Sequence, residues 1–169
     1  MAHVIAIDGP SGSGKSSTSR RVGRALGFLH VDSGALYRIM TWQCLAQGVE
    51  TSDPAAVAAC AERVQVECRP ENGALAYYVD GEAPGARIRT PEINAHASPV
   101  ATVKAVRDRI TALLRGMTRY GDLVVEGRDI TTVVFPDSPA LEAGLKPGDR
   151  IAYVKIDGET KSVAELGYQ

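Results

Sequence analysis

The chain has 169 residues, which suits one compact domain and excludes a large multidomain protein. Hydrophobic residues make up 44% of the chain and charged residues 23%, so a disordered or low-complexity protein is also excluded. Lysine and arginine number 19 against 20 acidic residues, and the net charge is -1. No overall positive field is therefore available to attract a nucleic acid polymer or an anionic membrane surface. Any site for a polyanion must be local.

The cysteines and the N-terminal residues bear on the compartment. Cys44, Cys60 and Cys68 follow one another at separations that match no zinc-ligand pattern, and an odd number of thiols cannot all pair within the chain. The apolar run at residues 3–8 is too short for a signal peptide or a membrane span. We therefore expect a cytoplasmic protein with reduced thiols.

The predicted elements begin with a β-branched strand at residues 3–8, a glycine-rich loop and a helix from 18 to 26. A second buried strand follows at 28–32. This order of strand, helix and strand within about 30 residues predicts a right-handed crossover and a parallel sheet. The later expected elements are helices at 35–47 and 54–61, a helix from 90 to 117 interrupted at Pro99, and a buried strand at 123–126.

Between these helices the pattern changes to that of a small antiparallel insert at about residues 62–98. Residues 64–68 and 75–79 are strand-like and are separated by a polar segment. Asp80-Gly81 then gives a strong signal for a tight turn. We therefore expect a short hairpin beside the parallel sheet.

The strongest motif is a loop in which glycines alternate with serines before a lysine. It reads Gly9-Pro10-Ser11-Gly12-Ser13-Gly14-Lys15-Ser16-Ser17. Glycines let backbone N–H groups approach phosphate, the lysine reaches the outer phosphates, and the Ser16 hydroxyl can ligate Mg²⁺. The alternative is a flexible turn, but the position between a strand and a helix favours nucleotide phosphate binding. The sequence therefore predicts an α/β fold of the P-loop NTPase type, a three-layer sandwich around a parallel sheet.

Three carboxylates end or follow predicted strands near this loop: Asp32, Glu126 and Asp129. Each could hold a magnesium-bound water or accept a proton, and each could equally cap a helix or pair with an arginine. We favour a substrate contact for Asp129 and leave the other two open. His3, His30 and His96 are far apart in sequence and are interpreted as ordinary surface or core residues.

Four further ordered blocks follow the loop: Asp32-Ser33-Gly34-Ala35-Leu36-Tyr37-Arg38, Ile88-Arg89-Thr90-Pro91-Glu92, Val106-Arg107, and Glu126-Gly127-Arg128-Asp129 with Thr132-Val133-Val134-Phe135-Pro136-Asp137. Together with the loop they carry a resemblance to bacterial cytidylate kinases that covers residues 4–137. It implies ATP with Mg²⁺ at the loop, catalytic roles for Lys15, Arg128 and Asp129, and monophosphate binding by the insert. The implied acceptor contacts are Ser33, Tyr37, Arg38, Arg89, Ser98, Arg107, Gly127, Arg128 and Asp129. Tyr37 could alternatively be ordinary helix packing.

The resemblance implies transfer of the ATP γ-phosphate to CMP or dCMP. The arginine-rich lid that this family carries after its last matching block is not recognisable here, so the chain is interpreted as truncated before the lid. From 138 to 158 the sequence instead resembles part of a PDZ domain. The alternatives are therefore a nucleotide-binding remnant with little catalysis and, less favoured, a PDZ-like peptide-binding module.

The expected organisation is a core at residues 1–137 and an atypical PDZ-like tail at 138–169 that packs on it. Residues 151–156 are expected to fill the next position of the parallel sheet, with a short helix at 161–166.

Overall fold

The computed structural model describes residues 2–136, 153–156 and 159–162. The chain divides into two compact units, Met1–Ser138 and Pro139–Gln169. All the residues that the sequence motifs predict to bind ATP or the acceptor lie in the first unit. In the described parts of the chain no helix is long and apolar enough to cross a membrane.

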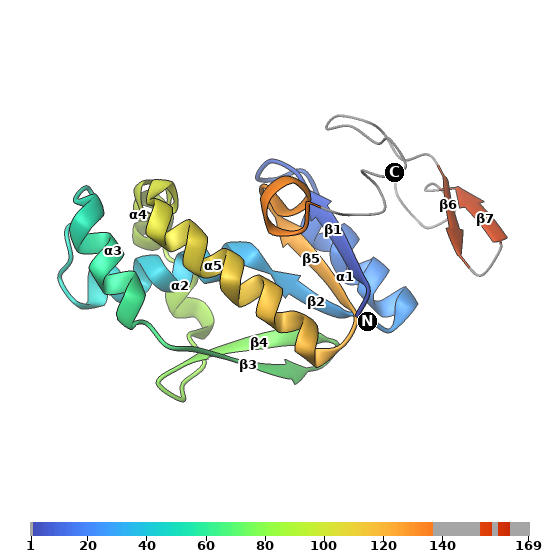
Figure 1. Ribbon diagram of the computed structural model, residues 1–169, viewed down its shortest axis with the longest axis horizontal. Helices are drawn as coiled ribbons and strands as arrows, with labels where there is room; N and C mark the ends of the chain where they lie inside the picture. Colours follow the sequence, from blue (N-terminus) through green and yellow to red (C-terminus); the bar gives the residue numbers. More distant parts are fainter. Residues whose placement is uncertain (1, 137–152, 157–158, 163–169) are drawn as a thin grey trace. The chain divides into compact units, whose positions relative to one another are not determined.

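The first unit is built on a five-stranded, mostly parallel sheet (Figure 1). Its spatial order is β1-β5-β2-β4-β3. The strands are β1 (Val4–Asp8), β2 (Leu29–Asp32), β3 (Val66–Glu71), β4 (Ala74–Val79) and β5 (Leu123–Gly127). Strands β1, β5, β2 and β4 run parallel, and β3 pairs antiparallel with β4. The α/β class predicted from the sequence is confirmed.

Helices lie on both faces of this sheet (Figure 1). They are α1 (Lys15–Leu26), α2 (Ser33–Ala46), α3 (Pro54–Arg63), α4 (Pro91–Thr102) and α5 (Lys104–Gly116). Val31 and Val125 share the main apolar core with residues of α2 and α5. Because side chains alternate along a strand, His30 and Glu126 point to the opposite face, where α1 packs on β2 and β5.

The insert is the hairpin β3–β4, as predicted, and it joins the sheet through the pairing of His30 with Ala74. Its turn residues Asn72 and Gly73 both have positive φ, as do Asp80 and Gly81 at the next turn. Two successive positive φ angles are typical of the tight turns that match strand twist. A 3₁₀ helix, η1 (Gly85–Arg89), connects this hairpin to α4.

The helix boundaries differ from the sequence prediction at several places: α1 begins at Lys15, α2 begins at Ser33, and the break between α4 and α5 is displaced. The expected interruption at Pro99 is wrong, because α4 continues through Pro99 to Thr102. The break lies at Val103, whose ψ of 120° is extended and separates α4 from α5. Two shorter helices flank β5: η2 (Met117–Tyr120) before it and the π-helical η3 (Ile130–Val134) after it.

In the second unit the structure describes one hairpin, β6 (Tyr153–Ile156) with β7 (Glu159–Ser162). These strands pair antiparallel in a two-stranded sheet of their own, so the expected parallel strand at 151–156 is wrong. Lys161 and Ser162 belong to β7 and not to the expected helix. The physical reason is that the antiparallel pairing of Tyr153–Ile156 with Glu159–Ser162 satisfies the backbone groups of both strands within this unit. The PDZ-like interpretation falls mostly outside the described residues.

Candidate active site

The glycine-rich loop connects β1 to α1 as the sequence predicts. Gly12 and Gly14 have φ of 79° and 83°, a left-handed conformation that costs glycine little and other residues more. The Lys15 ammonium donates to the Pro10 carbonyl over 2.9 Å, so the lysine folds back over its own loop. Ser17 N–H bonds to the Gly14 carbonyl and begins the helix. The loop thus presents backbone donors and one cation at a helix N-terminus, an arrangement suited to phosphate.

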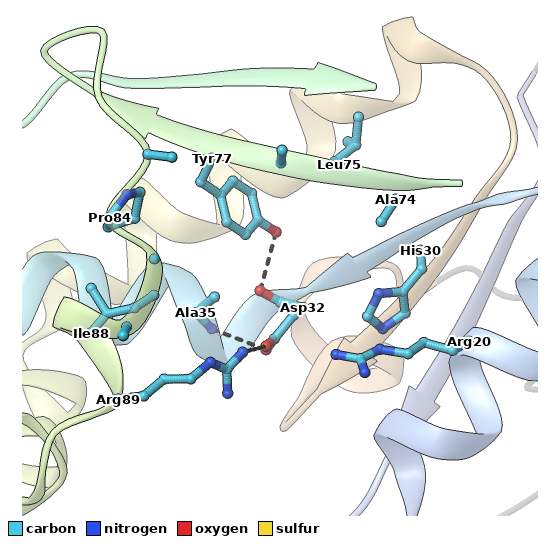
Figure 2. A pocket seen from close by; sticks show the side chains of 14 residues that line it. Arg20, His30, Asp32, Ala35, Ala74, Leu75, Tyr77, Pro84, Ile88 and Arg89 are labelled. Atoms are coloured by element: carbon cyan, nitrogen blue, oxygen red, sulfur yellow. Dashed lines mark hydrogen bonds and ion pairs between the residues drawn. The ribbon is translucent and has the colours of Figure 1, made fainter. Parts of the chain in front are cut away.

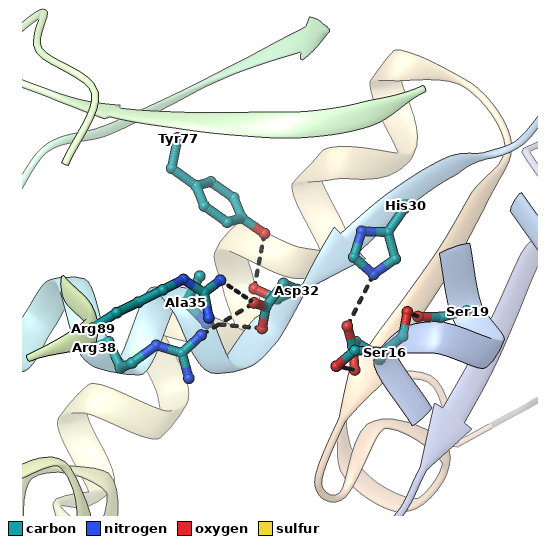
Figure 3. A network of polar contacts seen from close by, with 9 residues as sticks. Ser16, Ser19, His30, Asp32, Ala35, Arg38, Tyr77 and Arg89 are labelled. Carbon is teal, nitrogen blue, oxygen red and sulfur yellow. Dashed lines mark hydrogen bonds and ion pairs between the residues drawn. The ribbon is translucent and has the colours of Figure 1, made fainter. Parts of the chain in front are cut away.

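A chain of polar contacts leads from this loop into the sheet (Figure 3). The Ser16 hydroxyl donates to one Glu126 carboxylate oxygen over 2.6 Å, and His30 Nε2 lies 2.9 Å from the other. Glu126 and His30 are 2% and 6% exposed. The interpretation of Glu126 left open by the sequence is resolved in part: it contacts the loop serine and caps no helix.

Asp32 gathers two of the predicted acceptor arginines (Figure 3). Its carboxylate accepts from Arg38 over 3.1 Å and from Arg89 over 3.3 Å. The same carboxylate caps α2 by accepting the Ala35 N–H. Asp32 is therefore both a helix cap and an arginine partner, and it holds guanidinium groups from α2 and η1 at the carboxyl end of β2.

A further group, the Tyr37 group, consists of Tyr37, Arg107 and Asp129. Arg107 donates to Asp129 over 3.3 Å. Burial raises the pKa of the Tyr37 phenol, while Arg107 lowers it and Asp129 raises it by charge. Tyr37 therefore stays protonated near neutral pH and can donate a hydrogen bond. Asp129 has φ of 58°, a left-handed conformation that is uncommon for a residue with a side chain.

The end of β5 is crowded around Gly127. A Cβ there would lie 2.0 Å from Ser33 Oγ and 2.8 Å from Ile130 Cδ1, so both side chains would have to shift to admit any other residue. Asp8 fixes the segment that follows, because its carboxylate accepts the N–H groups of Ile130 and Thr131. The strand register places the ends of β1, β5 and β2 side by side, with Asp8 opposite Gly127 and Glu126 opposite Asp32. Ligands of open α/β sheets bind at this edge.

Arg128, which directly follows Gly127, is exposed, as are Arg89, Arg107 and Asp129, and Ser98 is exposed on α4. Apart from Arg128 and Ser98, the predicted residues lie in or beside three groups: the loop with Glu126, the Asp32 arginine pair, and the Tyr37 group.

A cavity of about 490 Å³ lies beside the first two groups (Figure 2). Asp32 and Arg89 line it together with His30, Tyr77 and Arg20. The Tyr77 hydroxyl donates to the Asp32 backbone carbonyl, and burial raises the pKa of this phenol well above its usual range. Tyr77 therefore remains a donor that connects the insert to the end of β2.

Sequence reasoning missed two residues of the site, Asp8 and His30. Nothing in the sequence distinguishes Asp8 from an ordinary strand end. His30 was interpreted as a surface or core residue, although it lies two residues before Asp32 and therefore on the same face of the strand. The sequence signal for His30 was therefore its two-residue spacing from Asp32, together with a second parallel strand that ends near Glu126.

Comparison with known proteins agrees with this geometry. Residues 5–142 match the family described as Cytidylate kinase. The chain belongs to the cytidylate kinase family. A Streptomyces avermitilis relative named cytidylate kinase is 44% identical over 162 residues, which cover 95% of this chain and 70% of the relative. A Mycobacterium leprae cytidylate kinase is 44% identical over 137 residues, or 80% of this chain and 60% of the relative.

The match also extends to a fused relative. A protein of Acaryochloris marina named bifunctional pantoate ligase/cytidylate kinase is 41% identical over 146 residues, covering 85% of this chain and 27% of that protein. The resemblance to cytidylate kinases predicted from the sequence is therefore confirmed for the first unit.

Proposed function

We propose that the chain is a cytidylate kinase that binds ATP at the glycine-rich loop and transfers its γ-phosphate to CMP or dCMP. The observation that carries this proposal is the meeting of the loop, the Asp32 arginine pair and the Arg107–Asp129 pair at one edge of the sheet. Phosphoryl transfer depends mainly on positioning and on neutralising phosphate charge. A lysine and several arginines arranged around two anionic substrates meet both needs.

The donor side of the reaction falls to the loop. We assign the ATP phosphates to the backbone of Gly9–Ser17 and to Lys15, which would leave its contact with the Pro10 carbonyl to reach them. Lys15 would then stabilise charge on the transferring group.

Magnesium fits the side chains beside this loop. Ser16 and Glu126 offer two hard oxygen ligands whose atoms lie 2.6 Å apart. Among the described residues no cluster of three or more His, Cys, Asp or Glu could hold a metal alone. This suits Mg²⁺, which keeps several waters and binds chiefly through substrate phosphates. We propose that Ser16 ligates the ion, with Glu126 beside it; when bound, the ion neutralises phosphate charge.

The acceptor side falls to the other two groups. We assign the CMP phosphate to Arg38, Arg89 and Arg128, and the nucleoside to Arg107, Asp129 and Ser98. The Arg38 Nε is buried and, in the described part of the chain, has no hydrogen-bond partner. Because a buried donor without a partner is costly, this atom is well suited to bind a phosphate oxygen. The same acceptor site includes Ser33, Tyr37 and Gly127.

A coupled assay that follows ADP release tests this function. With ATP and Mg²⁺ fixed, we expect ADP formation to require CMP or dCMP and to be much slower with AMP or UMP. The Lys15→Ala variant is the matched control for background activity. ATP binding without release of ADP on addition of either cytidylate would instead favour a nucleotide-binding remnant.

The remaining expectations concern the setting of the site. We propose that residues 1–137 form the nucleotide-binding core and that the protein acts in the cytoplasm. In support, Cys44, Cys60 and Cys68 are free thiols, which suits a reducing compartment. The comparisons give no support to a peptide-binding module.

A further inference from the structure

We propose that His30 is a positioning residue for the nucleotide and magnesium site, acting through Glu126 on the Ser16 hydroxyl. The inference rests on the proposed function of the loop. It assigns a task to a residue that neither the motifs nor the family match singles out. Figure 3 shows the residue pointing from β2 toward the loop.

The first support is the geometry of a continuous polar chain. His30 Nε2 lies 2.9 Å from Glu126 Oε1, and Ser16 Oγ lies 2.6 Å from Glu126 Oε2. The two ends of one carboxylate are therefore held by different partners. Rotation of the carboxylate about its last bond would break both contacts together. His30 thus sets the direction in which the second oxygen meets the serine.

The second support is burial. The side chains of His30 and Glu126 are only 7% and 3% exposed, so water cannot readily replace either partner. A buried carboxylate that loses a hydrogen bond carries an uncompensated cost, which it relieves by moving toward another partner. That movement would change its contact with Ser16. The imidazole therefore holds the Glu126 carboxylate in place.

The third support is the donor chemistry. A carboxylate oxygen accepts hydrogen bonds, so we assign the imidazole hydrogen of this contact to Nε2. Ser16 likewise donates its hydroxyl hydrogen to Glu126, which leaves the lone pairs of its oxygen available for a cation. In this row of hydrogen bonds both His30 and Ser16 donate to Glu126, and the free lone pairs of Ser16 Oγ face the site where Mg²⁺ is proposed to bind. Partners of this kind typically change metal affinity about 10- to 100-fold when removed.

The test compares two substitutions of His30 with a matched control. His30→Leu removes the donor at similar size, whereas His30→Gln keeps an N–H at a comparable reach. His96→Leu is the control, because His96 hydrogen-bonds to Thr51 over 2.7 Å and belongs to none of the three groups of the site. Thermal melting of each variant reports folding separately.

The first readout is ATP affinity measured by calorimetry with Mg²⁺ and with EDTA. We expect His30→Leu to lose about 10- to 100-fold in affinity for MgATP, with little change for metal-free ATP or for CMP. We expect His30→Gln to recover most of that loss and His96→Leu to match the wild type. Equal losses for all three ligands, or no recovery by His30→Gln, would mean that His30 is merely structural and would overturn the inference.

The second readout needs no nucleotide. Nitrogen-15 NMR of the metal-free wild type should show His30 protonated at Nε2, and a hydrogen on Nδ1 alone would contradict the proposed contact. If the wild type binds MgATP but His30→Leu binds it equally well, the inference fails while the proposed function stands. If the wild type binds no ATP at all, the proposed function fails and the inference falls with it.

Discussion

Replacing Arg38 by alanine tests whether the Asp32 arginine pair serves the acceptor. The guanidinium pairs with Asp32 over 3.1 Å, and its side chain is 21% exposed. A partly exposed ion pair of this kind contributes at most about 1 kcal/mol to stability, and Asp32 keeps its contacts with Arg89 and the Ala35 N–H. The fold should therefore survive Arg38→Ala.

The expected loss in binding is larger. Hydrogen bonds to a charged group contribute about 1.5–3 kcal/mol, which corresponds to a loss of roughly 10- to 150-fold in CMP affinity. ATP affinity should change less than about threefold, since the loop is untouched. Calorimetry with each nucleotide measures the difference. Arg87→Ala is the matched control, because Arg87 lies on the neighbouring η1 but pairs with Glu82 and faces Trp42. Equal losses for both nucleotides at unchanged melting temperature would refute the acceptor assignment.

Three further predictions concern other parts of the core. Lys15→Ala should abolish detectable phosphoryl transfer and weaken ATP binding; unchanged calorimetric affinity for ATP would contradict its role. Gly127→Ala should destabilise the fold by about 1–3 kcal/mol, seen as a lower melting temperature, because the added Cβ would overlap Ser33 Oγ. Burial, followed by the hydrogen bond with Cys60, raises the pKa of the Cys44 thiol to about 12. The folded state therefore favours the protonated thiol. The stabilisation from burying this thiol is complete below about pH 8.5, the ordinary thiol pKa of the unfolded chain, and is lost as the pH rises toward 12. Melting curves between pH 8 and 10.5 should show a steeper fall for the wild type than for Cys44→Ala, and parallel falls would be the contrary result.

The parts predicted correctly from the sequence are those governed by local chemistry. The glycine spacing around Lys15 fixes a loop whose conformation few other residues adopt. The helix expected from residue 54 begins at Pro54, and the preceding Asp53 caps it by accepting the N–H groups of Ala55 and Ala56. Asp80-Gly81 likewise forms the expected turn.

Two of the features that were missed depend on contacts between distant segments, and two others are local. The role of His30 follows from a glutamate 96 residues away, and Asp8 contacts residues more than 120 positions later. Pro99 fits inside α4, although a proline usually disfavours a helix interior. In the second unit the apolar run interpreted as a parallel strand pairs antiparallel with β7. Local patterns could not rank these alternatives.

The most direct test of the account follows the phosphate itself. The full chain is incubated with γ-labelled ATP, Mg²⁺ and CMP, and the products are separated. The account predicts that the label moves to CDP in equal amount to the ADP formed, and that Lys15→Ala shows no transfer. Label found in inorganic phosphate, or retained on ATP despite measurable binding of both nucleotides, would contradict it.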